Sequence, residues 1–344
     1  MSDILSDILA KLMNRTRLVA GALALAVIVA VASPAPAQQP SSVNPTASAV
    51  NEQQLLKALN RLDGRTTLPD AKSTVLERPA GRDWREFHTV TMKWIGGLAI
   101  LGMTALLIVF YMWRGTVRIE GGRSGRKIVR FTGIERFTHW LTASTFVVLG
   151  ITGLNITFGR ALILPWMGPE AFAAWSEWGK IAHNYLSFAF TLGVVLMFLL
   201  WIGQNFPTAA DVKWLKMGGG IMKGSKHAPA WKFNAGQKLM YWFVVLGGAA
   251  MIVTGFILMF PFYNGLNVAN MELAQVLHGV IGVLFIALII AHVYIGTVGM
   301  EGAFESMSEG TVDLNWAKEH HSLWVEEEMQ RGASDAKAMA RPAE

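Results

Sequence analysis

Four of the eight histidines in this 344-residue sequence lie inside long apolar stretches, where polar side chains are rare. They are His139, His183, His278 and His292. Because a polar group in hydrocarbon costs free energy, such residues usually mark a functional site. A single buried histidine would be better explained by a hydrogen bond between helices, so the arrangement of the four has to decide between the two interpretations.

The spacing of two of these histidines places both on the same side of one helix. His292 follows His278 by 14 residues, and at about 100° per residue this rotation falls only about 40° short of four full turns. A rise of about 1.5 Å per residue separates the two along the helix axis by about 21 Å. One histidine therefore lies near each face of a membrane, and both point into the same seam.

The elements that would position these side chains are five apolar runs. Charged residues make up 16% of the sequence and hydrophobic residues 52%, whereas an ordinary soluble domain carries about 25% charged residues. Each run lacks Asp, Glu, Lys and Arg and fits the roughly 20 residues that cross a bilayer. The runs are 94–113, 137–157, 182–203, 239–261 and 273–297. The sequence therefore predicts an integral membrane protein.

Loop charges predict the orientation of these spans. The loop 114–136 holds seven basic residues and the loop 204–238 holds six lysines, whereas 158–181 holds two basic residues and 262–272 holds none. By the positive-inside rule the two basic loops are cytoplasmic, and so is the C-terminal tail. The net charge of +6 is then mostly a topology signal. A nucleic-acid partner is disfavoured, because these bases lie in separate loops.

The N-terminus predicts a secretory signal peptide over residues 1–37. Basic residues precede the apolar run 18–33, and Ala35-Pro36-Ala37 supplies small residues for cleavage. An uncleaved anchor helix is the alternative, and both interpretations place the following residues outside the cytoplasm. Residues 38–92 would then form a polar outer segment, in which 51–62 has the apolar spacing of a short amphipathic helix.

Depth in the membrane predicts how the four histidines pair. The last span runs inward, so His278 is outer and pairs with His183, while His292 is inner and pairs with His139. A tetrahedral zinc site needs further ligands, and the spans hold no carboxylate and the sequence no Cys. Two facing imidazoles suit haem, because the porphyrin supplies four nitrogens and leaves two axial positions. With both positions filled by protein, electron transfer is favoured over oxygen binding.

The segment Asn234-Ala235-Gly236-Gln237-Lys238 places two amides and a glycine beside the membrane, on the side of the inner histidines. Asn and Gln side chains can hydrogen-bond the carbonyls of a quinone, and Gly lets a ring come close. An N-cap by Asn234 on a helix that continues from Gln237 explains the same residues equally well. Both interpretations stay open on spacing alone.

Small residues and a weak repeat accompany the histidines. A flat macrocycle could approach the helices at glycines in or near the spans, although ordinary helix packing explains them equally well. These glycines are Gly150, Gly153, Gly193, Gly279 and Gly282. Thr152-Gly153 follows His139-Trp140 at the spacing at which Thr254-Gly255 follows Tyr241-Trp242. Common ancestry of the second and fourth spans and chance recurrence are both open.

The remaining histidines predict no secure site. His88 directly precedes a span and is expected at the membrane interface. His227 lies in a Gly/Lys/Pro-containing loop and is expected in solvent. His320 and His321 are expected to cap the end of a helix in the tail, with contact to a partner as the alternative.

From Arg136 to about Trp324 the sequence resembles the gamma subunit of membrane-bound formate dehydrogenase, a dihaem cytochrome b. The resemblance rests on Arg136-Phe137-Thr138-His139-Trp140, Gly179-Lys180-Ile181-Ala182-His183, the 234–238 segment, His278 with His292, and Ala317-Lys318-Glu319-His320-His321. It implies that His139, His183, His278 and His292 ligate two b haems in the pairing above. It also implies that Asn234, Gly236 and Gln237, with the inner haem ligand, line a quinone site.

The fold that the resemblance implies is an all-α integral membrane protein of the bacterial inner membrane. Its centre is a four-helix cytochrome b bundle formed by the last four apolar runs, within residues 115–300. One extra N-terminal transmembrane helix, 93–114, precedes the bundle, and a cytoplasmic tail, 301–344, follows it. The signal peptide, the outer segment and the extra helix depart from the shortest members of the family.

The resemblance further implies partner subunits and a direction of electron flow. An iron–sulfur beta subunit would deliver electrons, and a catalytic alpha subunit containing molybdenum or tungsten would oxidise formate. This chain has no residues for formate chemistry and, without cysteine, none for an iron–sulfur cluster. Electrons would leave to a quinone reduced near the cytoplasmic face.

Three alternatives are weighed against this prediction. A cytochrome b subunit of a nickel–iron hydrogenase keeps the chemistry and changes the partner, so it is the nearest. A transporter that relays protons through histidines would need intramembrane acids or broken helices, and none is evident. A purely structural anchor would not need four buried histidines.

Overall fold

The computed structural model describes residues 79–220 and 227–339. Within them, five helical runs are long and apolar enough to cross a membrane, and they overlap the five predicted spans. The runs consist of α3 (Pro79–Glu86), η2 (Phe87–Thr91) and α4 (Met92–Arg114); α5 (Gly133–Leu154), η3 (Asn155–Gly159) and α6 (Arg160–Leu162); α8 (Pro169–Trp201) and η4 (Ile202–Gln204); α10 (Ala235–Trp242), η6 (Phe243–Gly247) and α11 (Gly248–Met259); and α12 (Val268–Tyr294) and η8 (Ile295–Gly299). The prediction of an all-α integral membrane protein is confirmed.

The N-terminal predictions are described only in part. The predicted signal peptide over 1–37 and the predicted helix over 51–62 lie outside the described residues. The end of the predicted polar segment is helical, because α3 and η2 lead without a break into α4. His88 lies in η2, where its ring stacks on Trp84 with 5.5 Å between the ring centroids.

Reciprocal side-chain caps fix where α5, α10 and α12 begin. In each, the side chain of the residue before the helix accepts the backbone N–H three residues later, and the side chain there accepts the N–H of the capping residue. The pairs are Thr132 with Glu135, Asn234 with Gln237, and Asn267 with Asn270. These caps satisfy N–H groups that a helix start leaves without partners.

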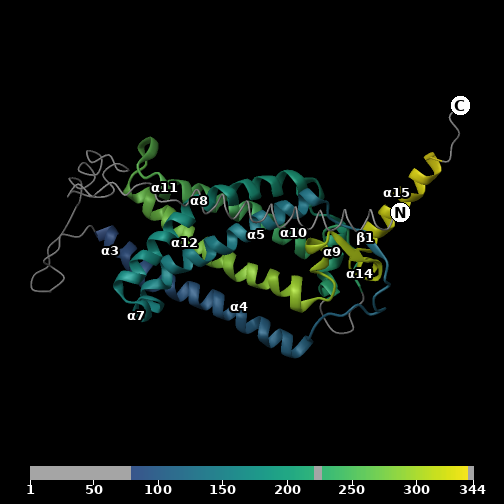
Figure 1. Cartoon of the computed structure of the whole chain (residues 1–344), viewed down its shortest axis with the longest axis horizontal. Coiled ribbons are helices and arrows are strands. Elements are labelled where there is room, and N and C mark those ends of the chain that lie inside the picture. Colours follow the sequence, from purple (N-terminus) through teal and green to yellow (C-terminus); the bar gives the residue numbers. More distant parts are fainter. Residues whose placement is uncertain (1–78, 221–226, 340–344) are drawn as a thin grey trace, which may run out of the picture. The chain divides into compact units, whose positions relative to one another are not determined.

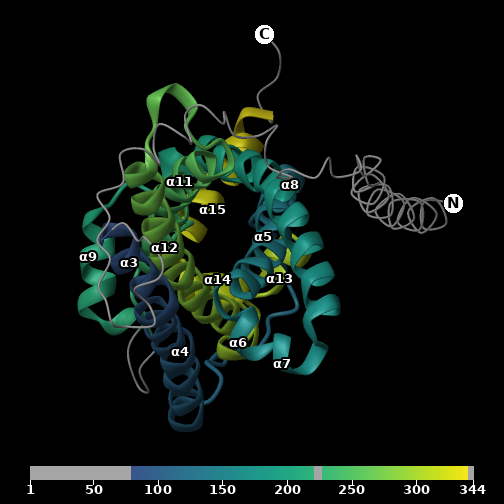
Figure 2. The ribbon, with the colours of Figure 1, turned by 90° about the vertical axis from the view of Figure 1, so that its left-hand side faces the viewer.

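Four of the long runs form a bundle (Figures 1 and 2). α5 packs along α8, α11 packs along α12, and α8 also contacts α11. The extra helix α4 packs along α12. Gly96 allows this approach, because a Cβ there would lie 2.9 Å from the Phe158 ring and 3.1 Å from the Val283 side chain.

Buried aromatic and aliphatic side chains join the bundle at the end where α5 and α10 begin. Three of the aromatic rings, those of Phe131, Trp201 and Phe233, lie within 5.9 Å of one another between centroids. The buried cluster consists of Phe131, Met197, Trp201, Phe233, Tyr241, Val244, Val245 and Phe285. Through Phe131, Phe233 and Trp201 it packs the residues just before α5 and α10 against the last turn of α8.

A small folded unit, here called the cap, covers that end of the bundle. It consists of residues 115–131, 227–233 and 300–333, which sequence analysis treated as loops and a tail. Strand β1 (Lys127–Val129) pairs antiparallel with β2 (Thr311–Asp313), with Ile128 opposite Val312. Helices α14 (Leu314–His320) and α15 (Ser322–Met339) follow, and their buried side chains pack with Ile119 and Val312.

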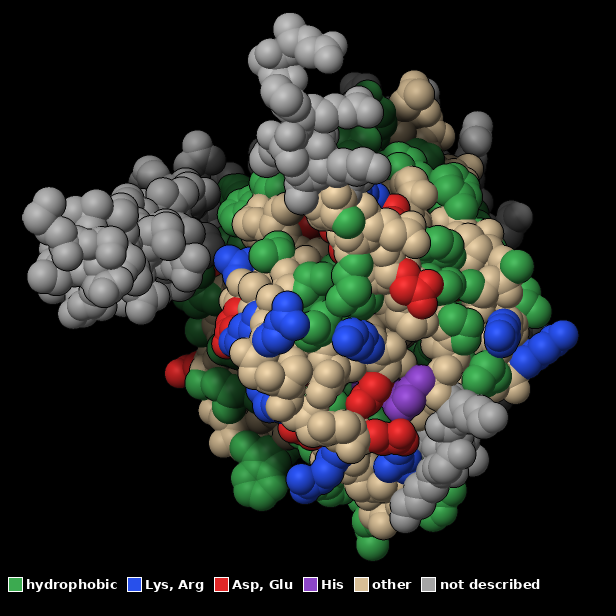
Figure 3. Space-filling view, turned by 90° about the vertical axis from the view of Figure 1, so that its right-hand side faces the viewer, with side chains coloured by type: hydrophobic (Ala, Val, Ile, Leu, Met, Phe, Trp, Pro, Cys, Tyr) green, Lys and Arg blue, Asp and Glu red, His purple; other side chains and the backbone are tan. Residues whose placement is uncertain are grey.

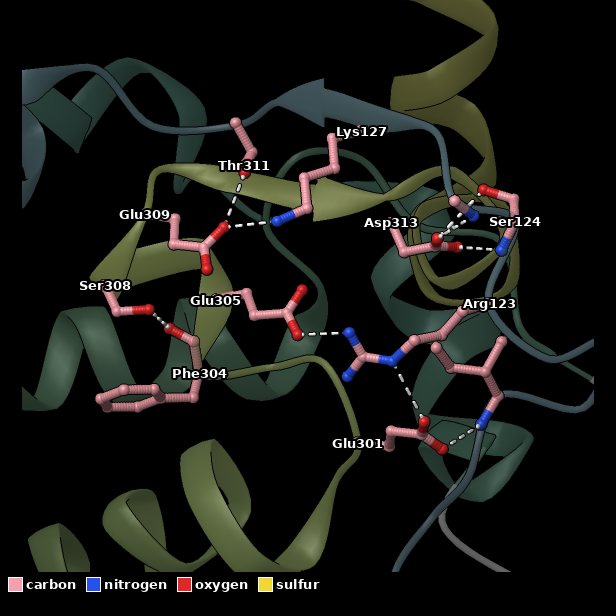
Figure 4. Close-up of polar contacts among 12 residues, drawn as sticks. Arg123, Ser124, Lys127, Glu301, Phe304, Glu305, Ser308, Glu309, Thr311 and Asp313 are labelled. Carbon is pink, nitrogen blue, oxygen red and sulfur yellow. Dashed lines mark hydrogen bonds and ion pairs between the residues drawn. The ribbon is translucent and has the colours of Figure 1, made fainter. Parts of the chain in front are cut away.

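Charged side chains join two segments of the cap, residues 115–131 and 300–333 (Figure 4). Arg123 forms ion pairs with Glu301 and Glu305, and Lys127 forms one with Glu309. The Asp313 carboxylate accepts hydrogen bonds from the backbone and hydroxyl of Ser124. Lys, Arg, Asp and Glu side chains are spread over this end of the molecule, without segregation by sign (Figure 3).

Four shorter elements within the described residues connect the spans: α7 (Leu164–Met167), α9 (Ala209–Lys216), η5 (Gly218–Gly220) and η7 (Tyr263–Gly265). A fifth, α13 (Glu305–Ser308), follows the last span and lies in the cap. The buried ion pair between Lys238 of α10 and Asp211 of α9, at 2.7 Å, ties the connection after α8 to the start of α10.

Candidate functional site

The four intramembrane histidines lie in two facing pairs. The rings of His183 on α8 and His278 on α12 are 6.2 Å apart between centroids, with 61° between their planes. The rings of His139 on α5 and His292 on α12 are also 6.2 Å apart, with 50° between their planes. Since α12 is one continuous helix from Val268 to Tyr294, the two pairs are separated along it by about 21 Å.

Threonine hydroxyls hold both rings of the His183–His278 pair. Thr152 Oγ1 on α5 lies 2.7 Å from His183 Nδ1, and Thr254 Oγ1 on α11 lies 2.9 Å from His278 Nδ1. Both threonines are buried. Each hydroxyl also donates to the backbone carbonyl four residues earlier in its own helix, at 2.8 Å and 2.7 Å.

The repeat noted in the sequence coincides with this arrangement. Thr152 and Thr254 are its two threonines, and its two tryptophans also make equivalent bonds. Trp140 Nε1 donates to the Met307 carbonyl, and Trp242 Nε1 donates to the Asn205 carbonyl. The repeat therefore marks a shared local structure. The spacing of the two threonines in the sequence predicts no role for either of them.

The His139–His292 pair has no such hydroxyls. His139 Nδ1 is buried without a hydrogen-bond partner. Within the described residues no hydrogen bond joins either ring of this pair to the backbone or to another side chain. The Trp140 indole is perpendicular to the His139 ring, with 5.2 Å between the ring centroids.

The pairs fit a metal that takes two protein ligands. Among residues 79–220 and 227–339, no group of three or more His, Cys, Asp or Glu side chains can hold a metal ion. A metal–imidazole bond of about 2 Å on each side puts the two ligand nitrogens about 4 Å apart, with the ring centroids farther out. The observed 6.2 Å leaves space for one ion per pair. A macrocycle that fills four positions and leaves two axial ones matches this donor set.

The five glycines considered as places for a macrocycle mostly serve helix packing. Cβ atoms at Gly150, Gly193, Gly279 and Gly282 would meet Ile286, Thr142, Met92 and Met251, respectively. Gly153 differs, because its nearest neighbour is the His183 ring at 3.7 Å. The repeat supplies its counterpart, Gly255, where a Cβ would lie 3.3 Å from His278 Cε1.

The amides of the 234–238 segment form the N-cap of α10. Asn234 Oδ1 accepts the Gln237 N–H at 3.0 Å, and Gln237 Oε1 accepts the Asn234 N–H at 3.1 Å. Because both oxygens bind the helix start, the side-chain NH₂ groups are the parts left to contact a ligand. At Gly236, the group that comes close is the Trp214 indole, 3.2 Å from a built Cβ.

Buried charges surround this helix start. Lys232 Nζ and Trp201 Nε1 both donate to Glu135 Oε1 at 2.8 Å. Arg130 donates to the Lys232 carbonyl at 2.7 Å and to Gln237 Oε1 at 3.3 Å. Burial lowers the pKa of Arg130 to about 9, against the opposing effect of Glu135. From the sequence, Arg130 is only one of the basic residues of a loop, and no role is predicted for Glu135 or Lys232.

The histidines of the cap make ring contacts that were not predicted. His321 is the C-cap residue of α14, as predicted, and its backbone N–H donates to the Ala317 carbonyl. Its ring is buried: Nδ1 lies 2.6 Å from the Trp231 carbonyl and Nε2 lies 2.9 Å from Arg130 Nη2. The His320 ring packs on Trp316 and on His227, with centroids 5.2 and 5.6 Å away. The prediction of a solvated His227 is wrong, because the fold of the cap brings His320 of α14 against the His227 ring.

Comparisons with known proteins agree with this architecture. The family described as prokaryotic cytochrome b561 matches residues 130–310, which include all four paired histidines and the 234–238 segment. The nitrate-inducible formate dehydrogenase cytochrome b556(Fdn) subunit of Escherichia coli K12 is 30% identical over 207 residues, 59% of this chain and 92% of that protein.

Two further relatives are similar at lower identity. The formate dehydrogenase cytochrome b556(fdo) subunit of Escherichia coli K12 is 27% identical over 58% of this chain and 92% of that protein. The formate dehydrogenase cytochrome b556 subunit of Haemophilus influenzae is 26% identical over 59% of this chain and 84% of that protein. The chain therefore belongs to the prokaryotic cytochrome b561 family, together with the cytochrome b556 subunits of formate dehydrogenase.

Proposed function

We propose that this chain is the membrane electron-transfer subunit of a formate dehydrogenase complex. It would accept electrons from an iron–sulfur partner subunit, while formate is oxidised in a separate molybdenum- or tungsten-containing subunit, and deliver them to a quinone. The observation that carries the proposal is the pair of two-histidine sites, spaced along α12 across the apolar part of the bundle. The names of three relatives support formate as the source of electrons.

Charge supports one orientation of the bundle in the bacterial inner membrane. The loop before α5 holds seven basic residues and the loop before α10 holds six, against two and none in the loops 158–181 and 262–272, and the two basic loops lie at the cap end. The positive-inside rule then places the cap in the cytoplasm and the N-terminal segment in the periplasm. In this orientation His183 and His278 form the outer pair, nearest the periplasm, and His139 and His292 form the inner pair.

Each pair would hold one haem b by its iron, through His183 and His278 in the outer site and through His139 and His292 in the inner one. When bound, haem supplies a one-electron iron couple. The protein would supply two histidine ligands to each iron, which would exclude oxygen from the metal, and it surrounds each site with apolar helices. Thr152 and Thr254 orient the outer rings.

The start of α10 is our candidate for quinone binding, on the cytoplasmic side. The NH₂ groups of Asn234 and Gln237 can donate to a quinone carbonyl, since their oxygens are bound to the helix. Gly236 lies between them in the sequence, and its contact with Trp214 supplies an aromatic wall for a ring. Glu135, Lys232 and Arg130 bring polar groups to the same end, where a reduced quinone would take up protons from the cytoplasm.

The test separates the capping role of these amides from ligand binding. Asn234→Asp and Gln237→Glu keep the oxygens that cap α10, because Asp is as good an N-cap as Asn, but remove the NH₂ donors. We expect each variant, in the intact complex, to retain both haems and to lose tenfold or more in quinone reduction with formate as donor. Asn267→Asp makes the same change in the cap of α12 and is the matched control.

Full quinone turnover in both amide variants would contradict the quinone site while leaving the haem assignment intact. Loss of haem in these variants would instead assign the segment to the support of the bundle. The hydrogenase alternative is tested separately, by whether the purified complex reduces quinone with formate or with molecular hydrogen. Turnover with hydrogen and none with formate would overturn the choice of partner.

A further inference from the structure

The outer histidines differ from the inner ones in the polar groups around them, and this difference bears on their strength as ligands. Both outer rings contact a buried threonine through Nδ1, whereas His139 Nδ1 has no partner. The two threonines come from different helices, α5 and α11, and each contacts a histidine on the next long helix. The same threonine–histidine contact therefore occurs twice in the outer pair, once at each ring.

Hydrogen-bond accounting favours one direction for these contacts. A hydroxyl has one hydrogen, and each threonine donates it to the carbonyl four residues back, Val148 for Thr152 and Ala250 for Thr254. The oxygen is then left to accept from Nδ1–H of the histidine. A ring with its hydrogen on Nδ1 has an unprotonated Nε2, which is the form that binds a metal.

An acceptor on Nδ1–H also changes the electronic character of the ligand. Hydrogen bonding at the far nitrogen raises the basicity of a metal-bound imidazole. A more basic ligand stabilises the oxidised, more highly charged iron relative to the reduced form. Second-shell hydrogen bonding is one of the means by which a protein sets the potential of haem.

We propose that Thr152 and Thr254 are positioning residues that fix the tautomer of His183 and His278 and lower the reduction potential of the outer site below that of the inner site. The proposal rests on the proposed function, since it requires haem at both pairs. This difference in potential gives electron transfer a direction, because electrons that enter at the outer pair then move toward a site of higher potential, next to the quinone.

The test replaces each hydroxyl by a methyl group in the full complex. Thr152→Val and Thr254→Val keep the volume and remove the acceptor, and Thr152→Ser and Thr254→Ser restore it. Thr145→Val is the matched control, because Thr145 is buried on α5 and bonds to the Leu141 carbonyl but to no histidine. The readouts are midpoint potentials from spectroelectrochemical titration and the electron paramagnetic resonance signals of the ferric forms, with the outer site assigned as the one that persists in His292→Ala.

We expect both Val variants to raise the outer potential, to shift the outer ferric signal and to weaken haem retention by about tenfold or more. The inner potential should stay unchanged, the double variant should show the larger shift, and both Ser variants should match the wild type. An unchanged outer potential in the Val variants overturns the proposal, as does an equal shift in Thr145→Val.

If a Val variant loses the outer haem, the corresponding Ser variant shows whether the lost hydroxyl or altered packing is the cause. Recovery of haem and potential with Ser supports the hydroxyl, whereas equal loss with Ser assigns the position to packing and overturns the proposal. These outcomes are distinguishable from failure of the proposed function, because wild-type protein with fewer than two haems would show that failure before any variant is made.

Discussion

The two ends of α12 hold equivalent histidine pairs in opposite surroundings. At the His278 end, neutral hydroxyls hold both rings and small residues lie beside them. At the His292 end, the rings have no hydroxyl partners, and a folded cap brings buried charges close to the starts of α5 and α10. The ring separation is 6.2 Å at both ends, so the difference lies in what surrounds the pairs.

This difference separates an end whose ligands are held by neutral hydrogen bonds from an end where charged groups lie beside the proposed site of proton uptake. Neutral hydrogen bonds at one end restrain the rings without bringing charge into the membrane, where charge is costly. At the other end the charged groups are paired, such as Lys232 with Glu135 at 2.8 Å, and lie at the boundary with the cap.

Removing one histidine from each pair is the strongest way to break the comparison. His278→Ala should abolish haem at the outer pair alone and His139→Ala at the inner pair alone, because each pair supplies its own two ligands. Haem content should fall by half in each variant, as measured by the pyridine haemochrome assay on purified protein. Loss of all haem from either variant would show that the two ends are one cooperative site.

Acidification should loosen the cap end and leave the outer pair's helices unchanged. Burial lowers the pKa of His320 to about 4, helped by the charges of His227 and Arg130, and burial together with Arg130 lowers the pKa of His321 well below its usual value. As pH falls below about 6.5, the unfolded chain therefore takes up protons that the folded cap does not. The free energy of unfolding of the cap decreases toward pH 4 and is insensitive to these groups above pH 7.

Hydrogen exchange measures this effect directly. Amides of α14, corrected for the intrinsic pH dependence of exchange, should lose protection between pH 7 and pH 5, and amides of α11 and α12 should not. His320→Gln removes one of the titrating groups and should reduce the loss of protection in α14 between pH 7 and pH 5. Equal protection of α14 at both pH values would contradict the buried neutral histidines.

The smallest effect concerns the two glycines beside the outer pair. Gly255→Ala places a Cβ 3.3 Å from His278 Cε1, so the ring must move by a few tenths of an ångström, whereas Gly153→Ala makes an ordinary contact of 3.7 Å with His183. We expect a detectable shift in the outer ferric signal for Gly255→Ala and none for Gly153→Ala. The reverse order would mean that α5, and not α11, sets the position of the pair.

The helical spans and the placement of the four histidines could be predicted from sequence because both depend on local periodicity. A helix of 3.6 residues per turn places His278 and His292 on one side whatever surrounds it. The role of Thr152 could not be predicted, since it depends on which helix packs against α5 and at what height. The repeat recorded the spacing of the threonines but not their partners.

The cap shows a second limit of local reasoning. Strands of three residues are too short for alternation to be visible, so β1 and β2 escaped detection. His321 contacts Arg130 and Trp231, which are distant in sequence, whereas its neighbours in the sequence predict only that it caps a helix. The capping interpretation of Asn234 needed only its neighbours, and it describes the contacts that the structure contains.

The central claim is that each histidine pair binds one haem b through both rings. Quantitative pyridine haemochrome analysis of the purified wild-type chain, combined with electron paramagnetic resonance of the oxidised protein, tests it most directly. The account predicts two b haems per chain, both six-coordinate and low-spin. One haem per chain, or a high-spin site with an open axial position, would contradict it.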